Sequence, residues 1–457
     1  MKKEEEKYSR REFLKRAGVY SGAMILGPTL LSACGLDKKS GTPSPSASAG
    51  GSSAAPAAAG GSKKTIKIGL LEPYSGPYAV SGTSEKQGAE IAMKEINDAG
   101  GIWGGYQIEY VTEDDQTKPN VGAEKARKLV EKDNVDILVG CVSSGVGLAV
   151  SAYAQQAGIP YVGTGIHSDE LTGAKVNKLF FRSTISNLMS ARATGKFLLD
   201  SGKKWYFITS DYSWGWSGEA AFMGVLKEAG GQVIGVDRIA LGSTDYSSQL
   251  TKAKSSGADV LIMSLYGSDL VNALKQFGQF GMIDKMMVGG PLNGTEIASG
   301  LSDAENVGYW GMPWAPDNGA PRATDFAKKI TDTYKTTINW RHWCGYNGTI
   351  AAIKAIEAAG TTEAAAVVKA FESLKWDGLK KSDVVMRDWD HQALQEVFVG
   401  QAIPKKDWAY DGQYFKVVGT GDGAKLAASK EENKDAIEVL SKQTIPARAN
   451  YSPVAKA

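Results

Sequence analysis

The sequence predicts an α/β protein with two similar lobes, each built on a parallel sheet that helices cover on both faces. From Thr65 onward, short apolar runs typical of buried strands alternate with amphipathic segments of helical period. The alternation runs to about residue 183 and resumes with the apolar run 205–209. Strands that alternate with helices of this length form parallel sheets. No short internal repeat is present, which argues against a solenoid.

The first stretch predicts four strands and three helices. Ala89, Ala92, Met93 and Ile96 lie at i, i+3, i+4 and i+7, as on one face of a helix, and Gly100-Gly101 ends that pattern. The expected strands are 65–71, 108–111, 136–140 and 159–162, and the expected helices are 89–96, 123–131 and 149–156.

The second stretch repeats this organisation, and a mixed region follows it. The expected strands are 205–209, 233–236, 259–263 and 286–288, and the expected helices are 222–229, 247–255 and 271–277. After these we expect a helix at 345–359, two antiparallel strands at 384–387 and 397–399, and a helical, partly exposed tail from about residue 425.

Composition excludes several function classes. Hydrophobic residues make up 42% of the chain and charged residues 22%, as in an ordinary globular protein with a sizeable core. Lys and Arg number 52 against 50 Asp and Glu, so no basic surface for nucleic acid is expected. The three His and three Cys form no cluster at metal-ligand spacing. We therefore expect no metal site, no cofactor and no nucleic-acid partner.

The first 34 residues predict export and attachment to a membrane. Ser9-Arg10-Arg11-Glu12-Phe13-Leu14-Lys15 resembles the twin-arginine export signal, and Leu31-Ser32-Ala33-Cys34 resembles a bacterial lipobox. Residues 1–33 would be a signal peptide, and Cys34 would carry lipid. The apolar run between these motifs is shorter than the roughly 20 residues that span a bilayer. The alternative is a membrane anchor that is never cut.

Residues 34–64 predict a flexible tether. This segment is rich in Gly, Ser, Ala and Pro and has almost no large apolar side chains, so it cannot bury enough surface to fold. The folded body would then stand off the membrane, in the periplasm or at the outer face of the cytoplasmic membrane.

Two cysteines remain for the folded body. Cys141 and Cys344 could form one disulfide in an oxidising compartment, or they could be two separate buried thiols.

A series of short motifs gives the chain a family resemblance. The motifs are Lys67-Ile68-Gly69-Leu70, Tyr74-Ser75-Gly76-Pro77, Gly82, Gly88-Ala89, Glu95-Ile96-Asn97-Asp98-Ala99-Gly100-Gly101-Ile102, Asp114-Asp115, Pro119, Gly158-Ile159-Pro160 and Asp390-His391-Gln392. In this order and spacing they resemble the type I periplasmic solute-binding proteins of branched-chain amino-acid ABC importers, the leucine/isoleucine/valine-binding-protein-like family. The resemblance extends from about Thr65 to past Gly400.

The resemblance implies a two-lobed fold and a transport role. Two Rossmann-like lobes would be joined by a hinge of three crossing strands and would close on a small solute. The first lobe would comprise 65–185 plus 312–378, and the second 186–311 plus 379–457. The expected partners are the solute, the membrane subunits of an ABC permease and, through Cys34, membrane lipid. The chain would act as a monomer.

Ligand-binding candidates in the first lobe follow two of its strands, because ligands bind beyond the carboxyl ends of parallel strands. Ser143 and Ser144 precede a helix whose free N–H groups suit a carboxylate, and by resemblance Ser143 binds the ligand carboxylate. The alternative is that one Ser only caps the helix. By resemblance, the backbone of Gly165 meets the ligand. His167 stands where the family often has Thr; it either contacts the ligand, with pH dependence, or forms a structural hydrogen bond.

The second lobe contributes aromatic candidates. Asp211-Tyr212-Ser213-Trp214-Gly215 resembles a family loop that offers an aromatic residue to the ligand, which would be Trp214. The alternative is that Trp214 packs in the core or hinge. Tyr266 matches a Tyr of the family that lies in the cleft. The remaining tryptophans are expected mostly in the core.

One departure from the family affects the ligand. Amino-acid binders of this family place a Glu near Pro291 to pair with the ligand ammonium, but this chain has Pro291-Leu292. Because a buried ammonium without a counter-charge is costly, the departure puts α-amino acids in doubt. Asp269 or Asp211 could substitute. The other ligand classes are aromatic carboxylates, amides and urea.

Three functions remain at this point. The first is solute capture for an ABC importer, and the second is a sensory receptor lobe with the same fold, which fold alone does not separate from the first. The third is an exported enzyme. It is disfavoured because the sequence has no Gly-x-Ser-x-Gly, no His-Glu-x-x-His and no phosphate loop. No catalytic residue is therefore assigned.

Overall fold

The computed structural model describes residues 64–456. The expected signal peptide, the lipidated Cys34 and the tether up to residue 63 lie outside the described residues. Among the described helices, none is both long enough and apolar enough to cross a membrane.

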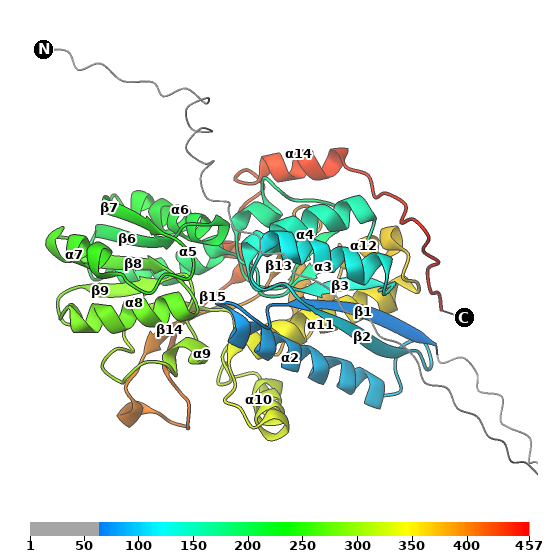
Figure 1. Cartoon of the computed structure of the whole chain (residues 1–457), viewed down its shortest axis with the longest axis horizontal. Coiled ribbons are helices and arrows are strands. Elements are labelled where there is room, and N and C mark those ends of the chain that lie inside the picture. The colour runs from blue at the N-terminus through cyan, green and yellow to red at the C-terminus, as the bar shows by residue number, and fades with distance from the viewer. Residues whose placement is uncertain (1–63, 457) are drawn as a thin grey trace, which may run out of the picture. The chain divides into compact units, whose positions relative to one another are not determined.

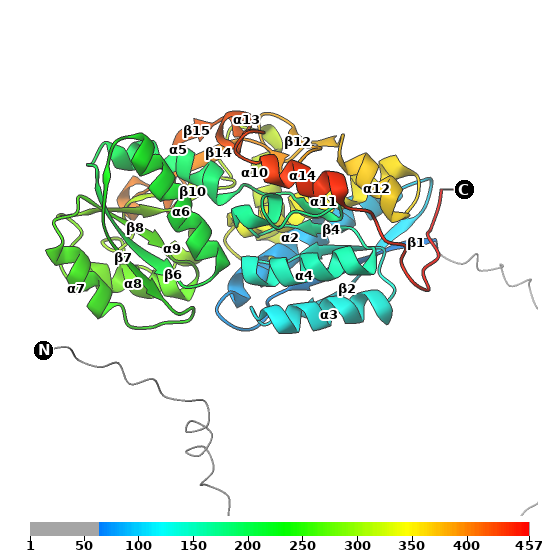
Figure 2. The same ribbon diagram turned by 90° about the horizontal axis from the view of Figure 1, so that it is seen from above.

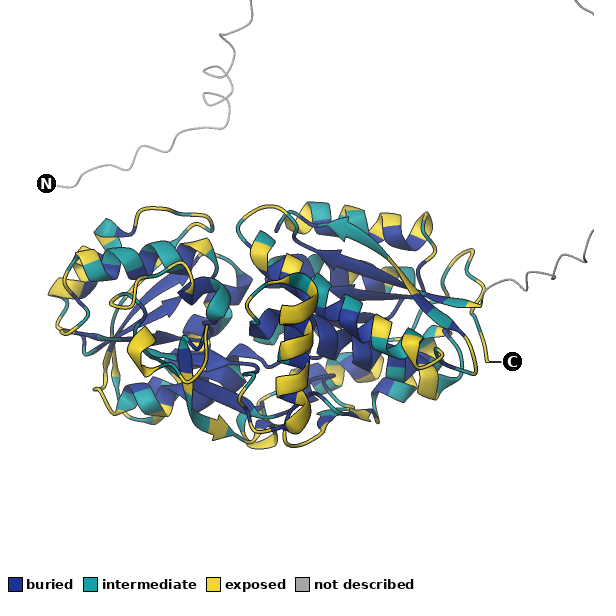
Figure 3. Cartoon of the chain, turned by 90° about the horizontal axis from the view of Figure 1, so that it is seen from below, coloured by how far each residue is buried: buried dark blue, intermediate teal, exposed yellow. Residues whose placement is uncertain are grey.

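The first lobe is a five-stranded parallel sheet in the order β2-β1-β3-β4-β5. Its strands are β1 (Thr65–Glu72), β2 (Gln107–Asp114), β3 (Ile137–Gly140), β4 (Tyr161–Gly163) and β5 (Phe180–Arg182). One face packs on α2 (Ala79–Asp98) and α11 (Trp340–Ala359), and the other on α3 (Pro119–Glu131) and α4 (Ser144–Ala157). Figure 1 shows this lobe around β1; β3, β4 and β5 are buried, whereas the edge strand β2 is mostly half-buried or exposed, and Figure 3 shows the buried interior of the lobe in dark blue.

The second lobe is a seven-stranded sheet in the order β15-β14-β10-β9-β8-β6-β7. Its strands are β6 (Lys204–Ser210), β7 (Gln232–Ile239), β8 (Val260–Ser264), β9 (Met287–Gly290), β10 (Tyr309–Met312), β14 (Val397–Ala402) and β15 (Phe415–Gly421). β14 pairs antiparallel with both of its neighbours, β10 and β15. The helices are α5 (Asn187–Leu199), α6 (Ser213–Glu228), α7 (Ser247–Ser255), α8 (Ser268–Gln279) and α9 (Thr295–Ala298). The expected two-lobed α/β fold is therefore confirmed.

The region after β10 differs from the expectation. Helices α10 (Pro321–Tyr334) and α12 (Ala364–Phe371) return to the first lobe, and a small sheet joins β11 (Lys375–Trp376), β12 (Val384–Met386) and β13 (Ala393–Leu394). The two strands expected to pair near 384 and 397 do not pair with each other. β12 lies in the small sheet, whereas β14 pairs with β10 and β15 in the second lobe.

The chain passes between the lobes at the Asp390-His391-Gln392 motif. The Arg182 side chain at the end of β5 donates from Nε to Gln392 Oε1 at 2.6 Å, and Gln392 Nε2 donates to the Thr184 carbonyl at 2.8 Å. The His391 ring stacks on Phe181 with centroids 4.2 Å apart. These contacts give the motif a structural role at the crossing between lobes.

The C-terminal residues 427–456, here called the C-terminal strap, lie along the first lobe. They include α14 (Lys434–Lys442), and Figure 2 shows this helix in red beside the helices of the first lobe. Arg448 Nη1 donates to the Val135 carbonyl at 2.6 Å, and Tyr451 donates to Asp136 at 2.6 Å. The expected lobe division assigned these residues to the second lobe. Ala427 and Glu432 do bond Arg192 of that lobe, whereas Arg448 and Tyr451 bond the first.

Close approach of α2 and α11 depends on two glycines. A Cβ atom added at Gly88 would lie 1.8 Å from the His342 carbonyl oxygen, and one added at Gly345 would lie 1.8 Å from the Glu85 carbonyl oxygen. Asn339 caps α11 by accepting hydrogen bonds from the backbone N–H groups of Arg341 and His342. The two glycines and the cap together hold Arg341 against Glu85.

Both remaining cysteines are free and buried. Cys141 follows β3, whereas Cys344 lies in α11. The expectation of two separate thiols is confirmed.

Candidate functional site

Residues that follow strands of both sheets, together with residues of α2 and α11, meet between the lobes, and we call this group the interlobe site. The first lobe contributes Tyr78, Glu85, Ser143, Ser144, Gly165, His167, Trp340 and Arg341. The second lobe contributes Tyr212, Trp214, Tyr266, Asn293 and Glu296. Direct bonds join the two sides. Tyr78 and Tyr212 share a hydrogen bond between their hydroxyls at 2.7 Å, and Trp340 Nε1 donates to the Asn293 carbonyl at 3.1 Å.

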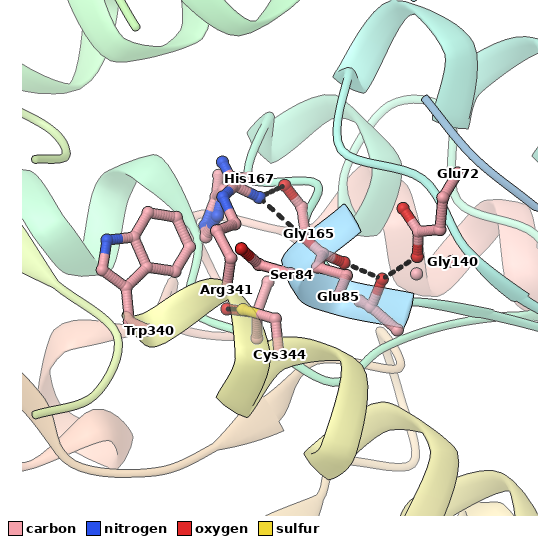
Figure 4. A network of polar contacts seen from close by, with 12 residues as sticks. Glu72, Ser84, Glu85, Gly140, Gly165, His167, Trp340, Arg341 and Cys344 are labelled. Carbon is pink, nitrogen blue, oxygen red and sulfur yellow. Dashed lines mark hydrogen bonds and ion pairs between the residues drawn. The ribbon is translucent and has the colours of Figure 1, made fainter. Parts of the chain in front are cut away.

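Arg341 is the centre of this site (Figure 4). Its guanidinium is 2% exposed and forms an ion pair with the fully buried Glu85, with Nη1 to Oε1 at 2.9 Å. Nη1 also donates to the Gly165 carbonyl at 3.0 Å, and Nε donates to the Tyr266 hydroxyl at 2.9 Å. Nη2 donates to none of the described residues. Two N–H donors of a buried cation are therefore left over for another acceptor.

The electrostatics of the pair favour a permanent cation and a titratable acid. Burial raises the pKa of Glu85 to about 7, although Arg341 and the Thr164 hydroxyl oppose the shift. Burial by itself would lower the pKa of Arg341, but Tyr266 and Glu85 raise it above its ordinary value. Arg341 keeps its charge at any pH at which the protein is folded, whereas Glu85 can take up a proton near neutrality.

Two further carboxyl groups lie behind Glu85. Glu72 ends β1 and Asp115 follows β2; both are buried, and one oxygen of each has no partner among the described residues. Burial, with repulsion from neighbouring carboxylates, raises the pKa of Glu72 well above its ordinary value. Burial raises that of Asp115 to about 7. Arg341 therefore lies next to a buried cluster of three carboxyl groups, those of Glu85, Glu72 and Asp115.

Aromatic rings surround the guanidinium. Arg341 lies 4.0 Å from the centroid of Trp340 and 4.6 Å from that of Tyr266, within range of cation–π attraction. Tyr266 in turn packs against Tyr78 and Trp214, with centroids 5.7 Å and 6.1 Å away. The site therefore combines one fixed charge with flat apolar walls.

The two predicted serines have different surroundings. Ser143 occupies the N-cap position of α4, but its side chain caps nothing and forms no hydrogen bond with the described residues. Ser144 Oγ accepts from the backbone N–H groups of His167 and Ser168 at 3.2 Å and 3.1 Å. Ser143 is therefore available to another group, whereas Ser144 orders the loop after β4.

Gly165 and His167 both lie beside Arg341. A Cβ atom at Gly165 would stand 2.1 Å from Glu85 Oε1 and 2.3 Å from Arg341 Nη1, so only glycine leaves room for the ion pair. His167 Nδ1 donates to the Ile185 carbonyl at 2.7 Å, which leaves Nε2 as a buried acceptor without a partner among the described residues. Burial and the Arg341 charge hold the His167 pKa well below its ordinary value, so its ring stays neutral.

The two predicted aromatic residues lie together. Trp214 is 3% exposed and packs between Tyr212 and Tyr266. Tyr266 accepts from Arg341 and donates to the Glu296 carboxylate, so it links a first-lobe cation to a second-lobe acid. Trp310, Trp314 and Trp343 are fully buried core residues, as expected for most of the tryptophans, and Trp216 is 42% exposed.

Several buried polar atoms of the site have no partner among the described residues. In the second lobe these are Ser213 Oγ after β6, Ser264 Oγ at the end of β8, and Asn293 Nδ2 and Glu296 Oε2 after β9. His167 Nε2 is the first-lobe counterpart. Because an unpaired buried polar group costs about 1–3 kcal/mol, their concentration between the lobes points to an external partner.

Sequence reasoning missed Glu85, Arg341 and Glu296, and it considered Trp340 only as one of the tryptophans expected mostly in the core. Glu85 and Arg341 lie inside helices and are 256 residues apart, so no local motif joins them. A buried Arg-Trp pair at the start of an apolar helix was an available signal for Arg341. Glu296 lies five positions beyond Pro291, where the family would place its Glu. Of the two substitutes considered, Asp211 accepts from Trp216 Nε1 and Asp269 accepts from the Gly242 N–H.

Comparison with known families identifies the chain. A periplasmic binding protein family model matches residues 65–407. The chain belongs to the periplasmic binding protein family. A relative in Brucella abortus (strain 2308), the Leu/Ile/Val-binding protein homolog 7, is 32% identical over 233 residues, which are 49% of this chain and 58% of the relative. The chain thus spans little more than half the length of that relative.

Solved structures agree on the fold. A periplasmic binding protein from Burkholderia mallei superposes with a TM-score of 0.77 at 26% identity and covers 82% of this chain and 100% of its own. A solute-binding protein of an ABC transporter from R. palustris, solved with benzoate, gives a TM-score of 0.70 at 22% identity, covering 79% of this chain and 97% of its own. The chain has the type I periplasmic binding protein fold.

Proposed function

We propose that this chain is the extracytoplasmic solute-binding lipoprotein of an ABC importer, and that it holds a small amino acid or a related organic carboxylate or amide between its lobes. One observation carries the proposal: unpartnered buried polar atoms from both lobes gather where the carboxyl ends of the two sheets face each other. A ligand between the lobes would satisfy these atoms.

Hinge closure is the proposed mechanism. The contacts that now join the lobes include the hydrogen bonds from Tyr78 to Tyr212, Trp340 to Asn293 and Arg341 to Tyr266. Water or a solute can replace such bonds when the lobes separate. A solute that touches both lobes binds the closed arrangement better and shifts the population toward it. Delivery to the permease needs no catalysis.

A thermal-shift screen tests this role. Purified full-length protein would be mixed with branched-chain amino acids, short amides including urea, and aromatic carboxylates. A compound that binds only the native protein raises the melting temperature by mass action. Ser143→Ala should weaken binding of a carboxylate by about 1–3 kcal/mol. If no compound in the panel shifts the melting temperature, the proposed role in capturing these solutes fails.

Export and anchoring are a separate part of the proposal. They rest on the twin-arginine-like segment from Ser9 to Lys15 and on the lipobox-like segment that ends at Cys34. Cys34→Ser should move the protein from the membrane fraction to the soluble fraction or leave it unprocessed. Unchanged fractionation and processing would argue against lipidation at Cys34.

A further inference from the structure

We infer that the ligand is a carboxylate without an ammonium group, whose carboxylate binds Nη2 of Arg341 and whose flat apolar body lies against Trp340 and Tyr266. This inference rests on the proposed function, since it names the solute class for the same site. It assigns the specificity to Arg341, a residue that lies far along the chain from the serines and aromatics that the sequence had suggested.

The first support is the donor set of Arg341. Glu85, Gly165 and Tyr266 take the three hydrogen bonds of Nε and Nη1, and they hold the guanidinium plane in one orientation. Both hydrogens of Nη2 remain without an acceptor among the described residues. A carboxylate is the acceptor that a guanidinium binds best, because it adds charge to the hydrogen bonds.

The second support is the balance of charge. Burial favours the neutral forms of Glu85 and Glu296, raising the pKa of each, whereas Arg341 remains a cation. Glu72 lies beside Glu85, and the neutral His167 and the titratable Tyr266 and Cys344 lie near Arg341. A ligand carboxylate beside Nη2 would therefore be attracted to a fixed positive charge, whereas a ligand ammonium there would be repelled by it.

The third support is the shape of the walls. The rings of Trp340 and Tyr266 already flank the guanidinium, and Tyr78, Tyr212 and Trp214 extend the aromatic surface. Rings from opposite lobes meet here, with Tyr78 and Trp340 on one side and Tyr212, Trp214 and Tyr266 on the other. When the lobes separate, the space between these rings suits a planar or slender apolar body.

One feature favours the opposite assignment and therefore enters the test. Glu296 Oε2 is a buried acceptor without a partner among the described residues, and it is the second-lobe group that could hold an ammonium. Its other oxygen accepts from Tyr266. Glu296→Gln keeps the size and removes the charge, so it separates the two assignments.

The experiment uses matched pairs of probes that differ in one group. Isocaproate is compared with L-leucine, hydrocinnamate with L-phenylalanine, and benzoate with benzamide, by calorimetry and thermal shift on full-length protein. We expect the acid without an amine to bind tighter in the first two pairs, and benzoate to bind tighter than benzamide. Arg341→Met should weaken binding of the acids about 10- to 100-fold, and Glu296→Gln should weaken it much less. Arg127→Met, which alters an exposed arginine, is the matched control.

Folding is controlled separately. Arg341→Met leaves Glu85 buried without its cation, so Arg341→Lys and the double variant Arg341→Met with Glu85→Gln are measured beside it. Lysine keeps the positive charge but lacks the planar set of N–H donors of the guanidinium, so the Arg341→Lys variant should bind the acids with intermediate affinity.

The outcomes separate this inference from the proposed function. Tighter binding of L-leucine or L-phenylalanine than of its acid counterpart, with loss in Glu296→Gln, overturns the inference and leaves the solute-binding role intact. Full affinity for the acids in a folded Arg341 variant also overturns it, as does binding of amides alone. Failure of every probe and of the wider panel would remove the proposed function itself.

Discussion

The two sides of the interlobe site are built on different principles. The first-lobe side is a charged network in which α2 and α11 press Glu85 against Arg341, with two more acids behind them. The second-lobe side presents rings and hydroxyls that follow β6 and β8, and its acid, Glu296, follows β9. The difference teaches that close-packed helices of the first lobe fix the charged groups of the site, whereas the second lobe mainly supplies its aromatic walls. Changes on the first side should therefore affect folding, and changes on the second should affect closure.

The largest effect is expected from breaking the charged network. Glu85→Ala leaves the Arg341 guanidinium buried without its counter-charge and should lower the free energy of unfolding by about 3–5 kcal/mol. Chemical denaturation of both proteins measures it. Asp98→Ala removes the exposed partner of Lys94 and should cost less than about 1 kcal/mol. A loss for Glu85→Ala no larger than that of the control would contradict the comparison.

A pH series sharpens the same side. Because burial raises the Asp115 pKa from 3.8 to about 7, the folded state holds a proton that the unfolded chain releases. The stability from this group is complete below pH 4 and is lost as the pH rises to about 7, a change of the order of 2–4 kcal/mol. Asp115→Asn should flatten this dependence and be more stable than the wild type at pH 8. The measurement is the denaturation midpoint of both proteins at each pH. If stability depends on pH in the same way in the wild type and in Asp115→Asn, the proposed titration of Asp115 is excluded.

The smallest effect is expected on the second side. Tyr212→Phe removes the hydroxyl that bonds Tyr78 across the lobes and should cost only about 0.5–1.5 kcal/mol in unfolding. The lobes should separate more easily, so small-angle scattering without ligand should give a larger radius of gyration than for the wild type. A strong loss of folding stability with unchanged dimensions would mean that this side, too, holds the fold together.

The sequence was sufficient for the fold because the alternation of strands and helices is local. The apolar run at 136–140 and the periodic residues from Ala89 to Ile96 each carried their own signal, and both elements are present. The strand pairing near 384 and 397 was wrong because partners in a sheet are chosen by tertiary packing. β14 pairs with β10, which lies far earlier in the chain, and not with the nearby strand β12.

The site could be predicted only in part for the same reason. Ser143, Gly165, Trp214 and Tyr266 follow strands, and strand ends are readable from the sequence; their roles as ligand contacts remain predictions. Arg341 was not predicted because its role depends on tertiary contacts: it pairs with Glu85 on another helix, and two glycines allow the two helices to touch. Glu296 was overlooked because it lies in α9, five positions beyond Pro291, the position at which the motif was read.

The C-terminal strap has a mechanical consequence. It returns the chain to the first lobe, where Tyr106 donates to the Ala455 carbonyl at 2.9 Å and the Lys64 amine lies 5.0 Å from the centre of the same Tyr106 ring. Both ends of the described chain thus leave from one place on one lobe (Figure 1). A force applied between the two ends would act on the first lobe and would not move the second lobe. The second lobe is then the part that can move relative to the first when the two ends are held.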